Sequence, residues 1–308
     1  MERMFVTIFL FVAAMLVSLK SNAIPVCNAG ARIKPLRPHK ELLHQVAIFG
    51  ERDDFTEKEW SSMIGRTEKY VHQRYAPTGT LRCKRFALSI SLTGSGSVAV
   101  TAGHAFIDPE DCSQVHSAGD CKALFRTADG KVVSEDFEIN AMGFKCPQIP
   151  TKCQDWAVLK LRRPIKGIRP YVIDENERLQ APHRVVAARA LMLDHYTVNG
   201  GKKSYYKTIG SCPVWRFDDS DECKDQLAYA ECDGTTGASG GSILNDDLGS
   251  TPVMLGMIIG GRESEEEAKE AREEGKPKVF PYEAGERESF VIPMQGAFRQ
   301  AVLEAQAK

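Results

Sequence analysis

The sequence has no strong net charge and no pair of cysteines at Cys-x-x-Cys spacing. Forty Lys and Arg residues face 41 Asp and Glu residues, which gives a formal net charge of -1. This balance, without a long basic run, gives no reason to expect a nucleic acid or an anionic membrane as partner. Without Cys-x-x-Cys pairs, and without a second ligand at a fitting distance from any histidine, the sequence predicts no metal site and no cofactor.

The sequence also lacks, at its N-terminus, an apolar run long enough to cross a bilayer. The run from Phe5 to Leu19 has about 15 residues, fewer than a membrane-spanning helix needs. It is followed by Lys20-Ser-Asn-Ala23, and this order is typical of a secretory signal cut after Ala23. An uncleaved membrane anchor is the alternative. We expect a secreted or periplasmic protein with no stable membrane insertion after cleavage.

Export changes the meaning of the nine cysteines, because exported thiols meet oxidants. Cys112 and Cys121 bracket a polar loop, while Cys146 and Cys153 bracket two prolines. These spacings predict two local disulfides, Cys112–Cys121 and Cys146–Cys153. One cysteine must be left over or bonded outside the chain, and spacing does not pair the other five: Cys27, Cys83, Cys212, Cys223 and Cys232.

Short apolar runs separated by turn residues dominate the chain after Arg82. Ala87–Leu92, Val98–Thr101 and Trp156–Leu161 are examples, and no long helices alternate with them. This pattern predicts an all-β protein. At 308 residues, the chain is long enough for one large or two small domains.

The most informative stretch is the glycine-rich loop Asp233-Gly-Thr-Thr-Gly-Ala-Ser-Gly-Gly-Ser242. Glycines on both sides of Ser239 allow a tight turn with amides facing a bound group, as a serine nucleophile requires. A plain hairpin loop is the alternative. The nucleophile elbow of α/β-hydrolases is excluded, because it needs a histidine after the serine and the last histidine is His195.

Two segments upstream supply the partners of such a serine. Val98-Ala-Val-Thr-Ala-Gly-His104 is an apolar run that ends in a histidine, and Asp155 opens the alternating run Asp155-Trp-Ala-Val-Leu. With Gly237-Ala-Ser-Gly-Gly241, the order His, Asp, Ser resembles the chymotrypsin-like (trypsin-like) serine peptidases. The resemblance covers roughly residues 80–300 and looks closest to their bacterial glutamyl-endopeptidase-like branch.

The resemblance implies two six-stranded antiparallel β-barrels with the site in the cleft between them, and a C-terminal helix. We expect a signal peptide at 1–23, a propeptide or N-terminal extension at 24–46, an N-terminal barrel at 47–170 and a C-terminal barrel with the terminal helix at 171–308. Met294–Ala305 has apolar residues on one face and is expected to pack on the second barrel. Arg262–Lys278 has a capping box and a Gly/Pro stop, which predict a short solvated helix.

The resemblance also implies roles for single residues. His104 is the general base, Asp155 orients it, Ser239 is the nucleophile and the amides of Gly237 and Ser239 form the oxyanion hole. Asp233 lies at the base of the substrate pocket, with Gly260 and Gly261 on its opposite wall. Ala238 stands where enzymes activated by cleavage carry an aspartate, so a requirement for one defined free N-terminus is not expected.

Two functions stay open at this point. The first is an exported serine endopeptidase, expected to be a monomer acting on protein or peptide substrates. The second is a non-catalytic peptide-binding or adhesion protein on the same fold.

Overall fold

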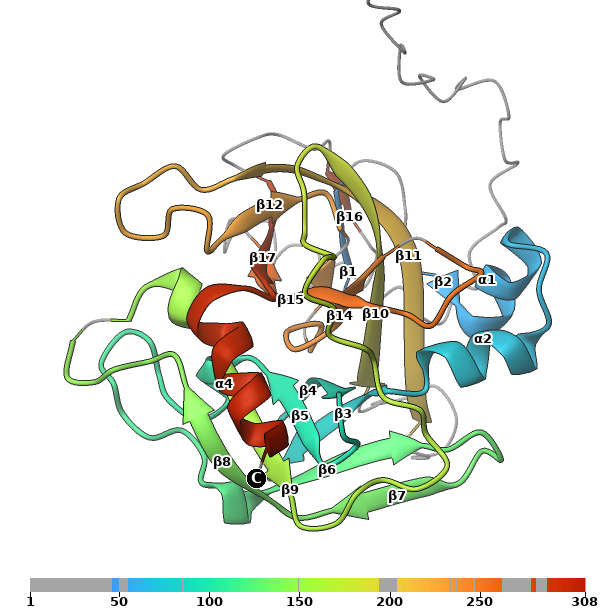
Figure 1. The fold of residues 1–308 in the computed structure, drawn as a ribbon, viewed down its shortest axis with the longest axis horizontal. Coiled ribbons are helices and arrows are strands. Elements are labelled where there is room, and N and C mark those ends of the chain that lie inside the picture. Colours follow the sequence, from blue (N-terminus) through green and yellow to red (C-terminus); the bar gives the residue numbers. More distant parts are fainter. Residues whose placement is uncertain are drawn as a thin grey trace, which may run out of the picture. The chain divides into compact units, whose positions relative to one another are not determined.

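Figure 1 shows the computed structural model of the chain as a ribbon. It describes residues 46–49, 55–84, 86–148, 150–193, 204–232, 234–235, 237–245, 247–261, 278–280 and 287–307. The expected signal segment, the extension before Val46 and Asp233 lie outside these residues, as does the expected helix at 262–278 except for its last residue.

The first sheet is antiparallel throughout and curls around an apolar core (Figure 1). In the described part of the chain it has seven strands in the spatial order β7-β6-β3-β4-β5-β9-β8. Their bounds are β3 (Thr78–Cys83), β4 (Phe86–Thr93), β5 (Val98–Thr101), β6 (Cys121–Arg126), β7 (Val132–Glu135), β8 (Phe137–Met142) and β9 (Ala157–Leu161).

Strand β4 shows how sequence alternation positions the rest of the molecule. Leu88, Ile90 and Leu92 are fully buried in the core of the first sheet. The alternating Ser89 and Ser91 point to the other face and are also fully buried, because the second half of the chain covers that face. Small hydroxyl side chains therefore line the contact between the two halves.

The second sheet closes on itself. Its order is β10-β14-β15-β17-β12-β11, with β11 pairing back to β10, so the described residues form a closed six-stranded barrel. The strands are β10 (His183–Leu193), β11 (Ser204–Phe217), β12 (Ala228–Ala230), β14 (Ser242–Leu244), β15 (Met254–Gly261) and β17 (Ser289–Pro293). Together the two sheets confirm the all-β prediction.

The start of the described chain pairs with the second half rather than the first. Strand β1 (Val46–Phe49) lies antiparallel to β13 (Gly234–Thr235) and parallel to β16 (Lys278–Phe280). Strand β2 (Phe55–Thr56) pairs with β11 of the barrel. The first described strands thus belong with the second half of the chain, and the strands of the first sheet follow them in sequence.

Two short helices follow β2. Helix α1 (Glu57–Met63) begins with a capping box in which Thr56 and Glu59 satisfy each other's backbone N–H groups. Helix α2 (Glu68–Tyr75) is capped by Thr67. Three 3₁₀ turns lie further along the described chain: η1 (Gly103–Ala105), η2 (Ala118–Asp120) and η3 (Lys152–Gln154).

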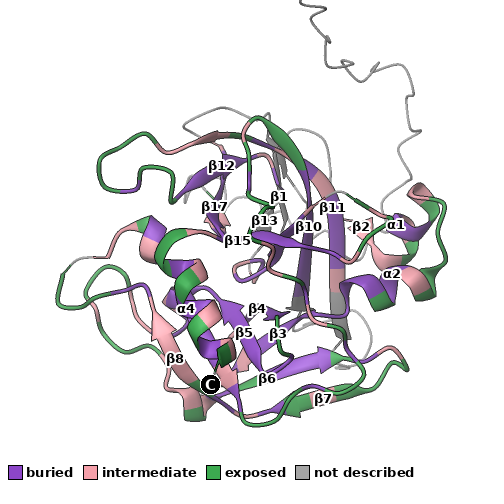
Figure 2. Ribbon diagram, in the orientation of Figure 1, coloured by how far each residue is buried: buried purple, intermediate pink, exposed green. Residues whose placement is uncertain are grey.

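The C-terminal helix α4 (Gly296–Ala307) is present as predicted, but its packing differs from the prediction. It lies against β5 and β9 of the first sheet. The ring of Phe298 contacts that of Trp156 at 5.4 Å between centroids, and Lys160 Nζ donates to the Ala305 carbonyl at 3.0 Å. The helix leaves the last barrel strand and crosses over, because the buried outer face of β5 and β9 offers its apolar side a partner. Figure 2 shows that this helix carries both buried and exposed residues, and the buried ones are Phe298, Ala301, Val302 and Ala305.

The predicted disulfides Cys112–Cys121 and Cys146–Cys153 are wrong. Among the described residues the bonds are Cys83–Cys121, Cys112–Cys146, Cys153–Cys223 and Cys212–Cys232. Strand pairing explains the error, because β3 and β6 place Cys83 directly opposite Cys121, with their Cα atoms 4.0 Å apart. Such long-range pairing leaves no trace in local spacing. Cys27 lies outside the described residues.

Two kinds of feature are absent from the described residues. No helix there is both long and apolar enough to cross a membrane. No group of three or more His, Cys, Asp or Glu side chains in the same residues is arranged to hold a metal ion.

Candidate active site

His104 lies in the turn η1 directly after β5. The four residues of β5 are fully buried and pair with β4 on one side and β9 on the other, so the end of the strand is fixed. Gly103 allows a close approach in this turn, because a Cβ there would lie 3.2 Å from both Phe144 and the Trp156 backbone and 3.3 Å from Asp155. The turn therefore packs tightly against the segment that carries Asp155.

Asp155 reaches His104 because β5 and β9 are neighbours. The pair Thr101–Ala157 brings the end of one strand beside the start of the other. Asp155 Oδ1 accepts from the His104 backbone N–H at 2.8 Å, and Oδ2 bonds to Nδ1 at 2.7 Å. A carboxylate only accepts, so Nδ1 carries the proton, and Nε2 of the neutral ring is left as an acceptor.

The surroundings of His104 change its pKa. Burial alone lowers it, but the hydrogen bond and negative charge of Asp155 outweigh burial, and the pKa of His104 lies above its ordinary value of 6.5. The imidazolium is thus stabilised by the same carboxylate that fixes the tautomer.

The loop Gly237–Gly241 lies against β4 and β15. The Ser89 backbone N–H donates to the carbonyls of Gly237 and Ser239 at 2.8 and 2.9 Å, and the Gly240 N–H donates to the Ile258 carbonyl at 2.7 Å. Gly240 has a φ of +88°, and a Cβ at this position would lie 1.9 Å from the Ser89 carbonyl oxygen. No other residue fits there.

This loop approaches the histidine segment through Thr101. A Cβ on Gly240 would also come within 2.7 Å of Thr101 Oγ1, whose hydroxyl donates to the Ser89 carbonyl at 2.8 Å. Thr101 stands three residues before His104. The loop that carries Ser239 therefore lies beside the end of β5, the strand that leads to His104.

Ser239 itself has a different partner from the one expected. Its hydroxyl donates to the carbonyl of Ile259 at 3.2 Å. In this conformation the His104–Asp155 pair is bonded and the Ser239 hydroxyl is directed to β15. No hydrogen bond to a described residue engages the amides of Gly237 and Ser239.

The predicted substrate-binding glycines end strand β15. Gly260 has a φ of +150°, and nothing lies within 4 Å of the position a Cβ would take, so the space beside it is open. Gly261 pairs with Ser289 of β17. Ala238 is buried, and its carbonyl accepts from the Gly241 N–H at 2.8 Å.

Sequence reasoning missed Ser89. Its side chain donates to the Gly237 carbonyl at 3.0 Å and accepts from the Ala190 N–H at 3.1 Å. The residue thus joins the first sheet, the barrel and the loop. A serine alternating with leucines is usually read as solvent-facing, so its pattern gave no signal of this role.

No family model matches the sequence, and no curated protein matches it. Solved structures do match the fold. The structure of a Glu endopeptidase in complex with MPD is 14% identical, with a TM-score of 0.54 over 85% of this chain and 100% of that one. The chain has a chymotrypsin-like serine peptidase fold. Mouse neuropsin, a serine protease expressed in the limbic system of the brain, is also similar, with 10% identity and a TM-score of 0.49 over 76% of this chain and 95% of its own.

In this chymotrypsin-like fold, His104 follows β5 and Asp155 precedes β9 of the first sheet, and the loop of Ser239 precedes β14 of the barrel. The fold agrees with the resemblance that the three motifs suggested. At these identities the similarity concerns the fold, so the chemistry has to be argued from the side chains.

Proposed function

We propose that this protein is an exported serine endopeptidase of trypsin-like mechanism. The observation that carries the proposal is the pair of hydrogen bonds from His104 to Asp155, which fix the ring tautomer and leave Nε2 as an acceptor. Four disulfides among the described cysteines support an oxidising compartment, and hence export.

The reaction needs Ser239 to turn away from Ile259. A rotation about its Cα–Cβ bond breaks a single 3.2 Å hydrogen bond, which contributes about 1 kcal/mol. His104 Nε2 then takes the hydroxyl proton while Oγ bonds to the substrate carbonyl carbon. The resulting oxyanion is stabilised by the amides of Gly237 and Ser239.

The intermediate then collapses to an acyl-enzyme. The peptide C–N bond breaks, and the leaving amine takes the proton from His104. Water attacks the acyl group in the same way, with His104 again as base, and releases the carboxylic acid and free Ser239. Asp155 stabilises the imidazolium in both steps and keeps its own charge.

A non-catalytic peptide-binding protein on the same fold is the second candidate. The hydrogen bond from Ser239 to Ile259 favours it, because a hydroxyl held in that position is not activated. The two functions differ in whether the serine reacts.

A fluorophosphonate probe tests this difference. The exported, disulfide-bonded protein should be labelled on the peptide that carries Ser239, and Ser239→Ala should abolish labelling. Ser95→Ala is the matched control, since Ser95 also lies between two glycines, and its variant should label like the parent. A folded parent that is not labelled, or equal labelling of Ser239→Ala, would remove the peptidase proposal and leave the binding protein.

We further propose that Asp233 gives a preference for Arg or Lys before the cleaved bond, because a carboxylate at the base of a pocket pairs with a basic side chain. The name of the structural neighbour, Glu endopeptidase, favours the opposite choice. Cleavage of a peptide library, followed by sequencing of the products, decides the matter. A basic profile that Asp233→Ser removes is expected, and an acidic or large apolar profile contradicts the assignment.

A further inference from the structure

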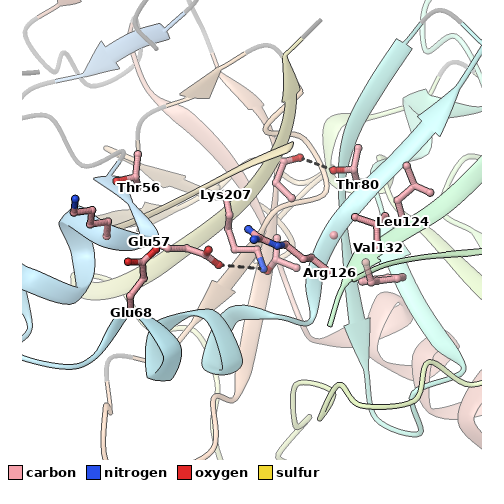
Figure 3. A pocket seen from close by; sticks show the side chains of 13 residues that line it. Thr56, Glu57, Glu68, Thr80, Leu124, Arg126, Val132 and Lys207 are labelled. Atoms are coloured by element: carbon pink, nitrogen blue, oxygen red, sulfur yellow. Dashed lines mark hydrogen bonds and ion pairs between the residues drawn. The ribbon is translucent and has the colours of Figure 1, made fainter. Parts of the chain in front are cut away.

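A cavity of about 270 Å³ lies where β3 and β6 of the first sheet meet helix α1 and strand β11. Figure 3 shows it from close by, with the side chain of Lys207 entering from β11, Arg126 from β6 and Glu57 from α1. We call it the β3–β6 cavity. Its lining includes the charged residues Glu57, Arg126 and Lys207 and the apolar residues Leu124, Phe125 and Val132. None of these residues belongs to the candidate active site.

Lys207 is the most unusual group in the cavity, because its side chain is only 8% exposed. An ammonium group has three N–H donors, and one of them goes to the Tyr75 carbonyl at 2.6 Å. Within the described residues Nζ makes no other hydrogen bond; its nearest carboxylate oxygen, Glu57 Oε1, is 3.8 Å away, beyond hydrogen-bond distance. Among the described residues, this buried cation thus has two N–H donors without a partner, and its side chain lines the cavity.

Glu57 does not neutralise Lys207 fully, because its carboxylate is already hydrogen-bonded to His72. His72 Nδ1 contacts Glu57 Oε1 at 3.0 Å, and Nε2 contacts the Thr127 carbonyl at 2.8 Å. Both partners are acceptors, so the ring carries both protons, and the pKa of His72 lies above 6.5. The charge of Glu57 is therefore balanced by the His72 imidazolium.

Arg126 adds a second cation to the same space. Its side chain forms no ion pair with any described residue, and its charge acts on Lys207 directly. Burial and this neighbouring charge lower the pKa of Lys207 to about 8, while Glu57 opposes them. Lys58 and Glu68, which also line the cavity, are exposed. Two like charges that face one cavity are stabilised by an anion between them.

The remaining wall is apolar. Leu124 and Phe125 are buried, and Val132 is exposed at the mouth. This combination suits a molecule with one charged end and an apolar body. One carboxylate is enough for the charged end, because Glu57 already lies 3.8 Å from Lys207 Nζ and offsets part of its charge.

We propose that the β3–β6 cavity binds a small organic carboxylate, with its carboxylate between Lys207 and Arg126 and its apolar body against Leu124 and Val132. The proposal is independent of the peptidase function, since it uses none of the same residues. A cavity of this volume admits a chain of a few carbons, and hexanoate is a suitable probe.

Titration calorimetry of the exported protein with hexanoate at pH 7 tests the proposal. Saturable binding at one site is expected, with a Kd below about 1 mM. Lys207→Met should weaken it more than tenfold, and Arg126→Gln by roughly three- to tenfold. Lys160→Met is the matched control, because Lys160 also donates to a backbone carbonyl, at 3.0 Å, but lies outside the cavity; it should bind hexanoate normally.

Two further measurements fix the ligand class. Hexanamide, which has no charge, and inorganic phosphate, which has no apolar body, should each bind at least tenfold more weakly than hexanoate. Affinity for hexanoate should also fall as pH rises through about 8, where Lys207 loses its proton.

Absence of saturable hexanoate binding overturns the proposal. Equal binding of hexanamide or phosphate does so as well, and so does normal affinity in both cavity variants. If Lys207→Met unfolds, as circular dichroism would reveal, the exposed Arg126 still provides a folded variant that decides the question.

Discussion

At the scale of single residues, the proposed roles of His104 and Asp155 predict how peptidase activity depends on pH. The general base must be neutral, so kcat/KM should rise with pH and level off above the pKa of His104. Asp155 holds that pKa above 6.5, which places the acidic limb of the profile above pH 6.5 as well.

Asp155→Asn should reduce kcat/KM by roughly three to four orders of magnitude, because an amide permits the wrong ring tautomer and carries no charge. The acidic limb should also move to lower pH, since the charge that raises the pKa of His104 is gone. Peptide hydrolysis between pH 5 and 9, with parent and variant side by side, measures both effects. A limb at an unchanged pH in the variant would show that another group controls the profile.

The residues of the candidate site divide by how they could be predicted. His104, Asp155 and Ser239 stand in short motifs whose order along the chain has chemical meaning. Ser89 bonds to the loop only because β4 lies beside that loop in the folded molecule. Its sequence pattern is the same as that of any half-exposed strand, so the contact could not be predicted. The hydrogen bond from Ser239 to Ile259 is equally hidden, because it depends on the side-chain rotamer.

At the scale of elements, helices α1 and α2 connect both halves of the molecule through one buried cluster. Glu57 begins α1, and His72 of α2 reaches the carbonyl of Thr127, which directly follows β6 of the first sheet. Lys207 of the barrel reaches the end of α2 at Tyr75. The charges of this cluster make its contribution to stability depend on pH.

The sign of that dependence follows from two shifts. The hydrogen bond to Glu57 raises the pKa of His72 against the effect of burial, so its stabilisation is present below pH 6.5 and is lost as pH rises through the folded-state pKa. Burial raises the pKa of Glu57, but the hydrogen bond from His72 and the charge of Lys207 lower it by more, so the net pKa lies below 4.5. The stabilisation that Glu57 contributes is therefore present above pH 4.5 and is lost as the pH falls through the folded-state pKa. The cluster contributes most between these limits.

His72→Gln should lower the free energy of unfolding by about 1–2 kcal/mol near pH 6, and by less at pH 9. Urea unfolding at several pH values measures the difference. His116→Gln is the control, because His116 stacks on Phe86 and has no carboxylate partner among the described residues. A His72 deficit that is constant from pH 6 to 9 would contradict the imidazolium assignment.

Strands and helices could be predicted where the signal lies in neighbouring residues of the sequence. The alternation in Ala87–Leu92 and the apolar run before His104 both became strands, and the terminal helix formed where its apolar spacing placed it. Partners were not predictable in the same way. The pairing of β1 with β13 and the crossing of α4 to the first sheet depend on which surface is left uncovered once the sheets have formed.

At the scale of the whole molecule, the bond Cys153–Cys223 joins the two halves beside the candidate site. Cys153 lies in η3, two residues before Asp155, while Cys223 lies in the loop between β11 and β12 of the barrel. The bond Cys83–Cys121 closes a loop whose length is of the same order, but both of its cysteines lie in strands of the first sheet. Comparing variants that lack one bond or the other therefore distinguishes a general loss of stability from an effect on the candidate site.

Replacing both cysteines of either pair by serine should cost up to about 4 kcal/mol of stability, since their sequence separations of 70 and 38 residues enter the chain-entropy term only as a logarithm. Only the Cys153/Cys223 variant should also lose activity under conditions where both variants remain folded. Asp155 then loses the anchor that ties its segment to the barrel, and a small displacement of the carboxylate weakens its hold on His104. Urea unfolding together with the rate of fluorophosphonate labelling measures the two effects. Equal labelling rates in the two folded variants would mean that η3 is held by the packing of Trp156 and Phe144 alone, and that the bond between the halves serves stability only.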